Sequence, residues 1–168
     1  MKCKINVFYF TWREERKLED SIQIINALLV NSFNQILTLE KEVLKEGPFS
    51  ELTLTELHAI EAIELKGKTM TEAAHKLGIT AGSLTVTINR LVKKEYVIRS
   101  DKEGDRRMVY LSLTKKGKLA WRLHNHFHRH MVKRMLEGLS EDEHQVLIRS
   151  LQSLIHFVEE QQACVKAK

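Results

Sequence analysis

Histidines recur in one stretch of the sequence at a spacing that suits metal binding. His124 and His128 are four residues apart, as are His126 and His130. On a helix this spacing places two imidazoles on one face, where both can bind a single Zn²⁺. The same histidines could instead cap or solvate a helix face. We therefore expect no cofactor and keep zinc as the alternative.

A second group of residues has the chemistry to read DNA. Helical spacing places short hydrogen-bonding groups, methyl groups and cations on one outward face, opposite an apolar stripe of Leu84, Ile88 and Leu91. Such a mixture suits the major groove, where side chains contact base edges and phosphates. The residues of this helix predicted to bind DNA are Thr80, Ser83, Thr85, Val86, Asn89, Arg90 and Lys93, with Lys94 as a further phosphate contact.

The run Asp105-Arg106-Arg107 adds a third candidate contact. An acid two residues before an arginine can orient the guanidinium through charge-assisted hydrogen bonds. An oriented arginine at the tip of a hairpin suits a narrow, electronegative minor groove. We therefore predict that Asp105, Arg106 and Arg107 belong to the DNA-binding surface.

Basic residues are concentrated around these candidates. The formal net charge of the chain is +5. Residues 90–118 hold ten Lys or Arg against four acids, a local charge of +6 that leaves about −1 for the rest. A local excess of this kind is expected of a polyanion binder. Charge alone would equally suit a solvated surface, so the helix face and the hairpin carry the interpretation.

Capping boxes and strand patterns define the elements that position these side chains. Thr53 with Glu56, and Thr69 with Glu72, begin two helices. A tight glycine turn leads from the second of these into the outward-facing helix, which is a helix-turn-helix arrangement.

Two apolar runs, residues 96–99 and 108–113, follow as strands, with residues 100–107 as the loop between them. The predicted fold is mainly α, a winged helix-turn-helix with a two-stranded β wing and long N- and C-terminal dimerisation helices.

Those long helices are predicted from apolar residues at three- and four-residue spacing in residues 18–46, 114–136 and the segment after the capping box Ser140–Glu143. Packing within one chain is the simpler explanation. A single helix-turn-helix core, however, leaves such helices little to bury against, so we predict a homodimer. A two-fold dimer sets its recognition helices about 34 Å apart and predicts a palindromic operator in double-stranded DNA. The hydroxyl and methyl groups of the reading helix favour AT-rich half-sites.

The expected domain organisation follows from these elements. It comprises an N-terminal extension or arm (1–17), a first dimerisation helix and linker (18–52), the DNA-binding domain (53–113), C-terminal dimerisation helices (114–162) and a tail (163–168).

Other classes of protein fit less well. The chain lacks a glycine-rich phosphate loop, a nucleophile elbow and an HExxH motif, and we expect Glu40 and Glu42 on a solvated helix face, so no enzyme is predicted. Cys3 and Cys164 form no CxxC pair, and residues 1–16 lack the features of a signal peptide, which favours a cytoplasmic protein without membrane contact. A basic helical adaptor for acidic proteins would explain the charge but not the reading helix and wing.

Three segments together resemble the MarR family of transcriptional regulators: residues 71–80, residues 89–99 and residues 105–117. As a combination they are specific, although each alone is weak. The resemblance covers about residues 18–160. It implies a winged all-α dimer whose terminal helices form the interface, with Arg107 as the wing arginine in the minor groove.

Residues 33–37, 57–60, 123–132 and 136–141 are similar to the FabT-type repressors of fatty-acid synthesis within that family. This resemblance implies a repressor of fatty-acid biosynthesis genes whose corepressor is acyl carrier protein bearing a long acyl chain. It also implies an apolar slot between the first, second and fifth helices. The residues implied to line this effector pocket are Phe33, Ile36, His58, Ile60, Phe127 and Met131.

Zinc-sensing members of the same family offer the competing interpretation. They place histidines in the fifth helix and a further one in the second, which implies the ligand set His58, His124 and His128 here. Those sensors also use acidic and cysteine ligands. Here Leu57 precedes His58 and no cysteine lies near it in the sequence.

Overall fold

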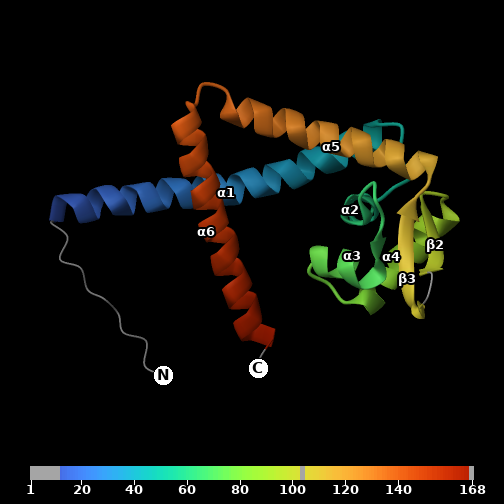
Figure 1. Cartoon of the computed structure of the whole chain (residues 1–168). Coiled ribbons are helices and arrows are strands. Elements are labelled where there is room, and N and C mark those ends of the chain that lie inside the picture. The colour runs from blue at the N-terminus through green and yellow to red at the C-terminus, as the bar shows by residue number, and fades with distance from the viewer. Residues whose placement is uncertain (1–11, 103–104, 167–168) are drawn as a thin grey trace.

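In this computed structural model the described residues, 12–102 and 105–166, form six helices and one three-stranded antiparallel sheet (Figure 1). Side chains are described over residues 17–100 and 109–165. The predicted mainly α winged helix-turn-helix fold is confirmed. The elements are α1 (Trp12–Glu46), α2 (Leu54–Ile63), β1 (Lys68–Thr69), α3 (Met70–Lys76), α4 (Ala81–Lys93), β2 (Val97–Lys102), β3 (Asp105–Leu113), α5 (Lys115–Leu136) and α6 (Glu141–Lys166).

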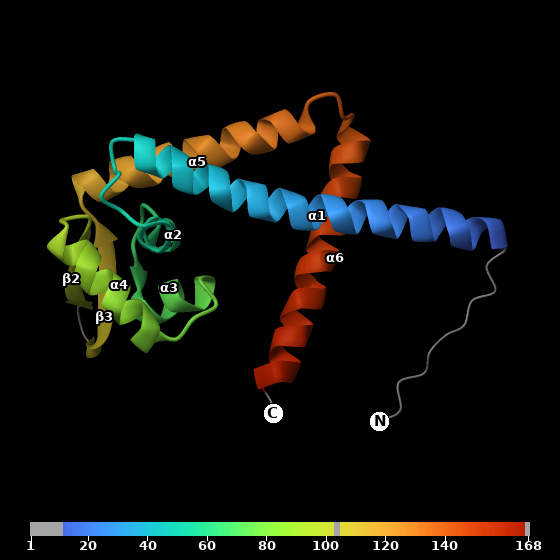
Figure 2. The same cartoon turned by 180° about the vertical axis from the view of Figure 1, so that it is seen from behind.

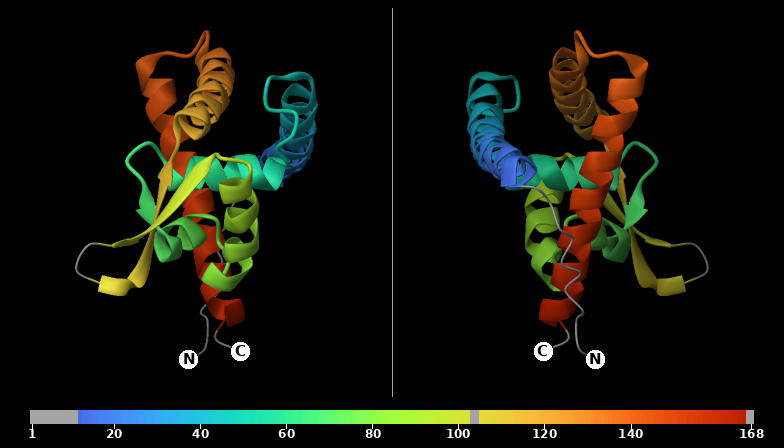
Figure 3. Two further views of the ribbon diagram at one scale, coloured as in Figure 1. Left: turned by 90° about the vertical axis from the view of Figure 1, so that its right-hand side faces the viewer. Right: turned by 90° about the vertical axis from the view of Figure 1, so that its left-hand side faces the viewer.

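The helix-turn-helix and the sheet form one body, from which the long helices extend. Figure 2 shows α1 running far beyond this body, with α6 turning back from the end of α5. In the side views of Figure 3, α5 lies on one side of α2, while α4 and the wing lie on the other. Helix α2 thus lies between α5 on one side and α4 with the wing on the other.

The core is made by the apolar faces that the sequence pattern predicts. Leu84, Ile88 and Leu91 of α4 are 0–1% exposed and pack with Ile60 and Ile63 of α2. Full burial of an aliphatic side chain contributes about 1.5–3 kcal/mol, so this cluster dominates the stability of the body. The predicted capping boxes at Thr53, Thr69 and Ser140 are all formed, which sets where α2, α3 and α6 begin.

The sheet differs from the predicted two-stranded wing in two respects. Lys68 and Thr69 add a short strand, β1, on the outer side of β3, giving the order β1-β3-β2. The strands of the wing are also longer than expected, because residues up to Lys102 and from Asp105 pair in the ladder. Residues 100–107 are therefore not all loop. Backbone pairing in an exposed ribbon does not require apolar side chains, so the hydrophobic pattern underestimates its length.

Helix α1 begins at Trp12, six residues before the predicted start, so part of the expected N-terminal extension is helical. The remainder of that extension, residues 1–11, lies outside the described residues. Between Lys17 and Glu46 the helix is long and apolar enough to cross a membrane by length and composition. This is weak evidence, since helices that pack against protein pass the same test. Amide side chains such as Asn31 and Gln35, which hydrogen-bond each other at 2.9 Å, interrupt the apolar residues.

Candidate nucleic-acid interface and adjoining pockets

The outward face of α4 carries the predicted reading residues. Val86, Asn89 and Arg90 are exposed, as is Lys93. The face begins at Thr80, whose hydroxyl oxygen accepts the backbone N–H of Ser83 at 3.1 Å and so caps the helix. The helix thus presents the two methyl groups of Val86, the amide of Asn89 and the cations of Arg90 and Lys93 on one exposed face.

Three hydroxyls on this face are already engaged within the helix and its cap. The Thr85 hydroxyl donates to the Ala81 carbonyl oxygen at 2.8 Å, and the Thr80 and Ser83 hydroxyl oxygens lie 2.9 Å apart. A hydroxyl that donates to its own helix can still accept a hydrogen bond and still presents its methyl group. Thr85 is thus suited to apolar contact with a thymine methyl group or to accepting a hydrogen bond.

Lys94 was predicted as a further phosphate contact, but its side chain is engaged by neighbouring segments of the chain. Its ammonium group lies 2.8 Å from a Glu56 carboxylate oxygen and donates to the Glu51 carbonyl oxygen at 2.6 Å. Burial raises the pKa of Glu56, but the hydrogen bonds from Lys94 and from the Thr53 backbone outweigh it and hold that pKa below its usual value. Lys94 therefore ties α4 to the start of α2, and sequence spacing alone could not show this.

The wing arginines predicted to read the minor groove lie in β3. Asp105, Arg106 and Arg107 belong to the ladder, with Lys102 paired opposite Asp105. Their side chains lie outside the described residues, so their role stays a prediction.

A hollow between the wing and the helix-turn-helix brings Thr85 together with residues that the sequence analysis did not assign to DNA binding. Basic and hydroxyl side chains from β1, α3 and β2 line it beside the N-terminus of α4. The turn Lys66-Gly67-Lys68 could have indicated this hollow from the sequence, because two lysines around a glycine are typical of an exposed basic loop. The polar and charged residues that line the hollow are Glu64, Lys66, Lys68, Thr69, Thr71, Glu72, Thr85, Arg99 and Tyr110.

Tyr96 joins the reading helix, the wing and α5. Glu95 ends α4 in the left-handed region at φ 63°, and the Tyr96 N–H donates to the Leu91 carbonyl oxygen at 2.9 Å. The Tyr96 carbonyl oxygen accepts the Thr114 N–H at 3.1 Å, where α5 begins. A Cβ on Gly117 would lie 2.1 Å from that same carbonyl oxygen, so only glycine lets α5 approach this closely.

The Tyr96 side chain extends this junction to the loop between α1 and α2. The ring is fully buried and contacts Phe49 edge-on, with ring centroids 5.9 Å apart. Its hydroxyl donates to the Glu51 carboxylate, which also pairs with Lys116 at 3.0 Å. These hydrogen bonds lower the pKa of Glu51 to about 2, Tyr96 first and Lys116 second. We call Phe49, Glu51, Tyr96 and Lys116 the Tyr96 junction.

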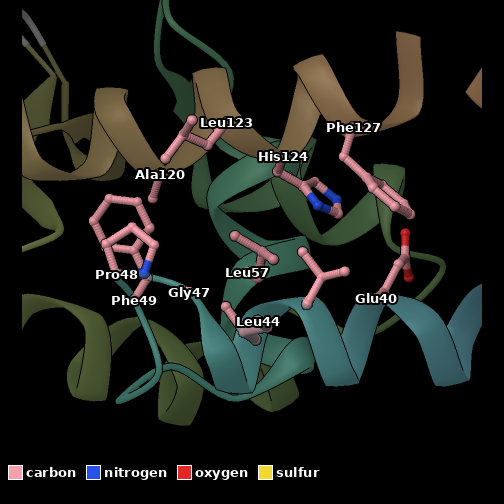
Figure 4. A pocket seen from close by; sticks show the side chains of 11 residues that line it. Glu40, Leu44, Gly47, Pro48, Phe49, Leu57, Ala120, Leu123, His124 and Phe127 are labelled. Atoms are coloured by element: carbon pink, nitrogen blue, oxygen red, sulfur yellow. The ribbon is translucent and has the colours of Figure 1, made fainter. Parts of the chain in front are cut away.

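An apolar cavity of about 220 Å³ lies between the end of α1, α2 and α5 (Figure 4). Phe49 of the Tyr96 junction closes one end, whereas Glu40 and His124 lie at the other. Leu57 and Phe127 contribute to its walls. The remaining lining residues are Val43, Leu44, Gly47, Pro48, Ala120 and Leu123.

The residues implied to line one effector slot are distributed over two places. Phe127 lines the cavity of Figure 4. Phe33, Ile36 and His58 line a second, neighbouring hollow between α1, α2 and α3. Ile60 is 0% exposed in the core and lines neither.

Met131 is half-buried on α5 and likewise lines neither space. The reason for the division is Glu40, which projects between the two spaces and lines both.

A histidine–carboxylate cluster surrounds Glu40. This side chain is buried, so the expectation that Glu40 lies on a solvated face is wrong, whereas Glu42 is exposed. The Glu40 carboxylate oxygens lie 3.3 Å from His58 Nε2 and 2.8 Å from His128 Nε2. His124 Nε2 lies 3.1 Å from His128 Nε2, and His124 also groups with His58, but no candidate metal group among the described residues holds all three histidines implied as zinc ligands.

Glu61 completes this cluster on the α2 side. Its carboxylate lies 3.4 Å from His124 Nε2, and that hydrogen bond lowers the pKa of Glu61 against the opposing effect of burial. Two groups of side chains could each hold a metal ion: Glu40-His58-His124 and Glu61-His124-His128. Within each group, the three ligand atoms lie within 4.8 Å of one another. No acid directly precedes His58 in the sequence. The carboxylates of this cluster come instead from Glu61, one turn further along α2, and from Glu40 of α1.

Comparisons with known proteins agree with this geometry. The sequence model described as the MarR family matches residues 50–108. Among solved structures, the chain is similar to Streptococcus pneumoniae FabT in complex with DNA, with a TM-score of 0.75 and 37% identity over 83% of this chain and 98% of that chain. The Staphylococcus aureus MepR–DNA complex is similar in fold, with a TM-score of 0.65 and 17% identity over 80% of this chain and 97% of that chain.

A curated sequence relative is YfiV of Bacillus subtilis strain 168, described as an uncharacterized HTH-type transcriptional regulator. It is 35% identical over 91 residues, which is 54% of this chain and 56% of that protein. The chain thus matches little more than half the length of this relative.

The Tyr96 junction predicts a pH dependence of stability. The pKa of Glu51 is about 2 in the folded chain and 4.5 when unperturbed, so its stabilisation is complete above pH 4.5 and is lost as the pH falls towards 2. The E51Q variant should unfold at lower urea concentration at pH 7 and lose less further stability between pH 4.5 and 3. The expected effect is at most about 1 kcal/mol, because this carboxylate is 44% exposed and screened.

The Y96F variant removes the hydroxyl donor but keeps the ring. It should likewise lose less stability than the native protein between pH 4.5 and 3. If E51Q follows the native pH profile throughout, Glu51 does not hold this junction.

Proposed function

Because this chain belongs to the MarR family of winged helix-turn-helix regulators, we propose that it represses transcription as a homodimer on an AT-rich palindromic operator. It is a DNA-binding transcriptional regulator and not an enzyme. The observation that carries the proposal is the similarity, at 37% identity over 98% of its length, to a FabT chain bound to DNA. The exposed α4 face and the wing are the surfaces that this function needs.

Exposed apolar faces on the long helices support the homodimer. Ile22 and Ile25 of α1 and Leu151 and Ile155 of α6 are 40–57% exposed although they are aliphatic. Contiguous apolar faces of this size are unfavourable in water and mark an interface. A two-fold dimer would cover both and hold two α4 helices for successive major grooves. In this proposal the protein works in the cytoplasm.

Removing the wing arginine tests the operator interaction. The R107A variant should bind the protein's own promoter at least about tenfold more weakly, with a smaller salt dependence, because a cation is lost from the DNA surface. Fluorescence anisotropy with labelled duplex measures both. The matched control is K133A, an exposed cation of α5 on the far side of α2, which should bind like the native protein. Equal affinity of R107A and native protein would contradict the assigned role of Arg107, provided both remain dimeric.

For the effector, we infer that long-chain acyl carrier protein acts as corepressor for fatty-acid biosynthesis genes. The apolar cavity of Figure 4 supports this, because aliphatic and aromatic side chains line it and an acyl chain would bury methylene groups there. Phe49 forms its end and contacts Tyr96, from which β2 starts. Filling the cavity would therefore restrain Phe49 and, through Tyr96, the wing.

A charge at the cavity wall tests the acyl site. Leu123 lines the cavity, so L123E should leave operator binding without ligand unchanged and lose at least about tenfold of the tightening by long-chain acyl carrier protein. The control is L119E, one turn earlier on α5, since Leu119 is equally exposed but is not among the lining residues. Anisotropy and gel filtration report operator affinity and dimer state. An acyl response of L123E equal to that of L119E would remove the cavity from the mechanism.

A zinc-responsive repressor is the second candidate function, favoured by one observation. His58, His124 and His128 lie beside Glu40 and Glu61, which offers imidazole and carboxylate donors of the kinds that Zn²⁺ binds. The comparisons give this candidate no support. The same contacts also form a partly buried hydrogen-bonded network between α1, α2 and α5, which needs no metal.

Zinc titration separates the two candidates. If zinc is the effector, it should change operator affinity in the native protein and lose this effect in H124A/H128A. The control pair H126A/H130A keeps the same spacing on the exposed side of α5 and should respond like the native protein. A native protein that binds its operator equally with and without zinc, but more tightly with acyl carrier protein, would eliminate the zinc candidate.

A further inference from the structure

Helix α5 has a strongly basic face that neither the DNA surface nor the cavity uses. Its 22 residues include seven Lys or Arg and four histidines but no Asp or Glu. Five of these side chains are exposed along one side and line a shallow groove with Asn125. They are Arg122, His126, Arg129, His130 and Lys133, and we call them the α5 basic face.

No described carboxylate neutralises the charge on this face. No ion pair joins any of the five side chains to an acid of the described residues. By contrast, the neighbouring Arg134 pairs with Glu137 at 2.7 Å, and His124 and His128 pair with carboxylates on the inner side. Arg122, Arg129 and Lys133 are thus cations held in a row on one rigid helix, and such a row attracts carboxylates.

The position of the face excludes the operator as its occupant. Ala120 and His124, two of the buried residues of α5, lie on the side that packs against α2. Residues two and five positions further on lie on the opposite side, because the helix has 3.6 residues per turn. Figure 3 shows α4 and the wing beyond α2, on the other side of the molecule from α5. DNA held by α4 therefore cannot reach the α5 basic face of the same protomer.

The same face of a second copy is also a poor occupant. Two such faces would carry like charges against each other, which opposes association. The apolar faces of α1 and α6 offer a better interface for self-association, and they lie on other helices.

We propose that the α5 basic face is the docking surface for an acidic protein, and that this protein delivers the ligand of the neighbouring cavity. Leu123 connects the two sites. It lines the cavity, and it shares a side of α5 with His126 and His130, three and seven residues further on. A partner held by carboxylates on the basic face thus has the cavity within about one helical turn.

The identity of the partner as the acyl carrier protein rests on the proposed function. The experiment compares native protein with the charge-reversed variant R122E/R129E/K133E, using carrier protein with a long acyl chain, carrier protein without it, and vesicles of anionic phospholipid. Native protein should bind the acylated carrier more weakly as salt rises. The reversed variant should bind it at least about tenfold more weakly. Its affinity for operator DNA alone should equal that of native protein.

The control variant K41E/K45E reverses two exposed cations of α1 and should bind the acylated carrier like native protein. The docking surface is refuted if native protein responds to the acylated carrier and the reversed variant responds equally. It is also refuted if the reversal weakens operator binding alone, or if anionic vesicles compete with the carrier for the face. A native protein that ignores the acylated carrier overturns the proposed function itself, and the docking proposal falls with it.

Discussion

The buried Tyr96 side chain is the contact on which the arrangement of this molecule depends. Its backbone hydrogen-bonds to Leu91 near the end of α4 and to Thr114 at the start of α5. Its hydroxyl donates to Glu51 in the loop between α1 and α2. A buried phenol must be hydrogen-bonded, and Glu51 meets this requirement while Lys116 offsets the carboxylate charge. The end of α4, the start of the wing, the start of α5 and the loop after α1 are consequently joined at this one residue.

Glu40 imposes a second constraint, between the two spaces beside α2. A buried carboxylate is costly unless it is hydrogen-bonded, and here two histidines from different helices satisfy it. The cluster closes one end of the apolar cavity, while Phe49 closes the other and leads to Tyr96. Any ligand in this cavity therefore lies between a polar network that joins three helices and an aromatic contact that leads to the wing.

The surface chemistry of the long helices separates their partners. Apolar residues lie exposed on α1, α5 and α6, and α5 also presents basic side chains on its outer side. Apolar faces associate without regard to charge, but a uniformly basic face repels its own copy and attracts acids. In the proposed function, the apolar faces of α1 and α6 serve self-association and the basic side of α5 serves an acidic partner, while α4 remains available for DNA.

Local chemistry within the sequence determined most of the fold. The capping boxes, the inward stripe of α4 and the strand pattern after it predicted the winged helix-turn-helix, because caps and periodicity act within a few residues. Contacts between distant segments were decided by the tertiary structure alone. Lys94 pairs with Glu56, and Glu40 is buried. The residues expected in one effector slot line two separate spaces or neither. Each outcome depends on which side chain from another helix lies opposite, and no spacing along one helix contains that information.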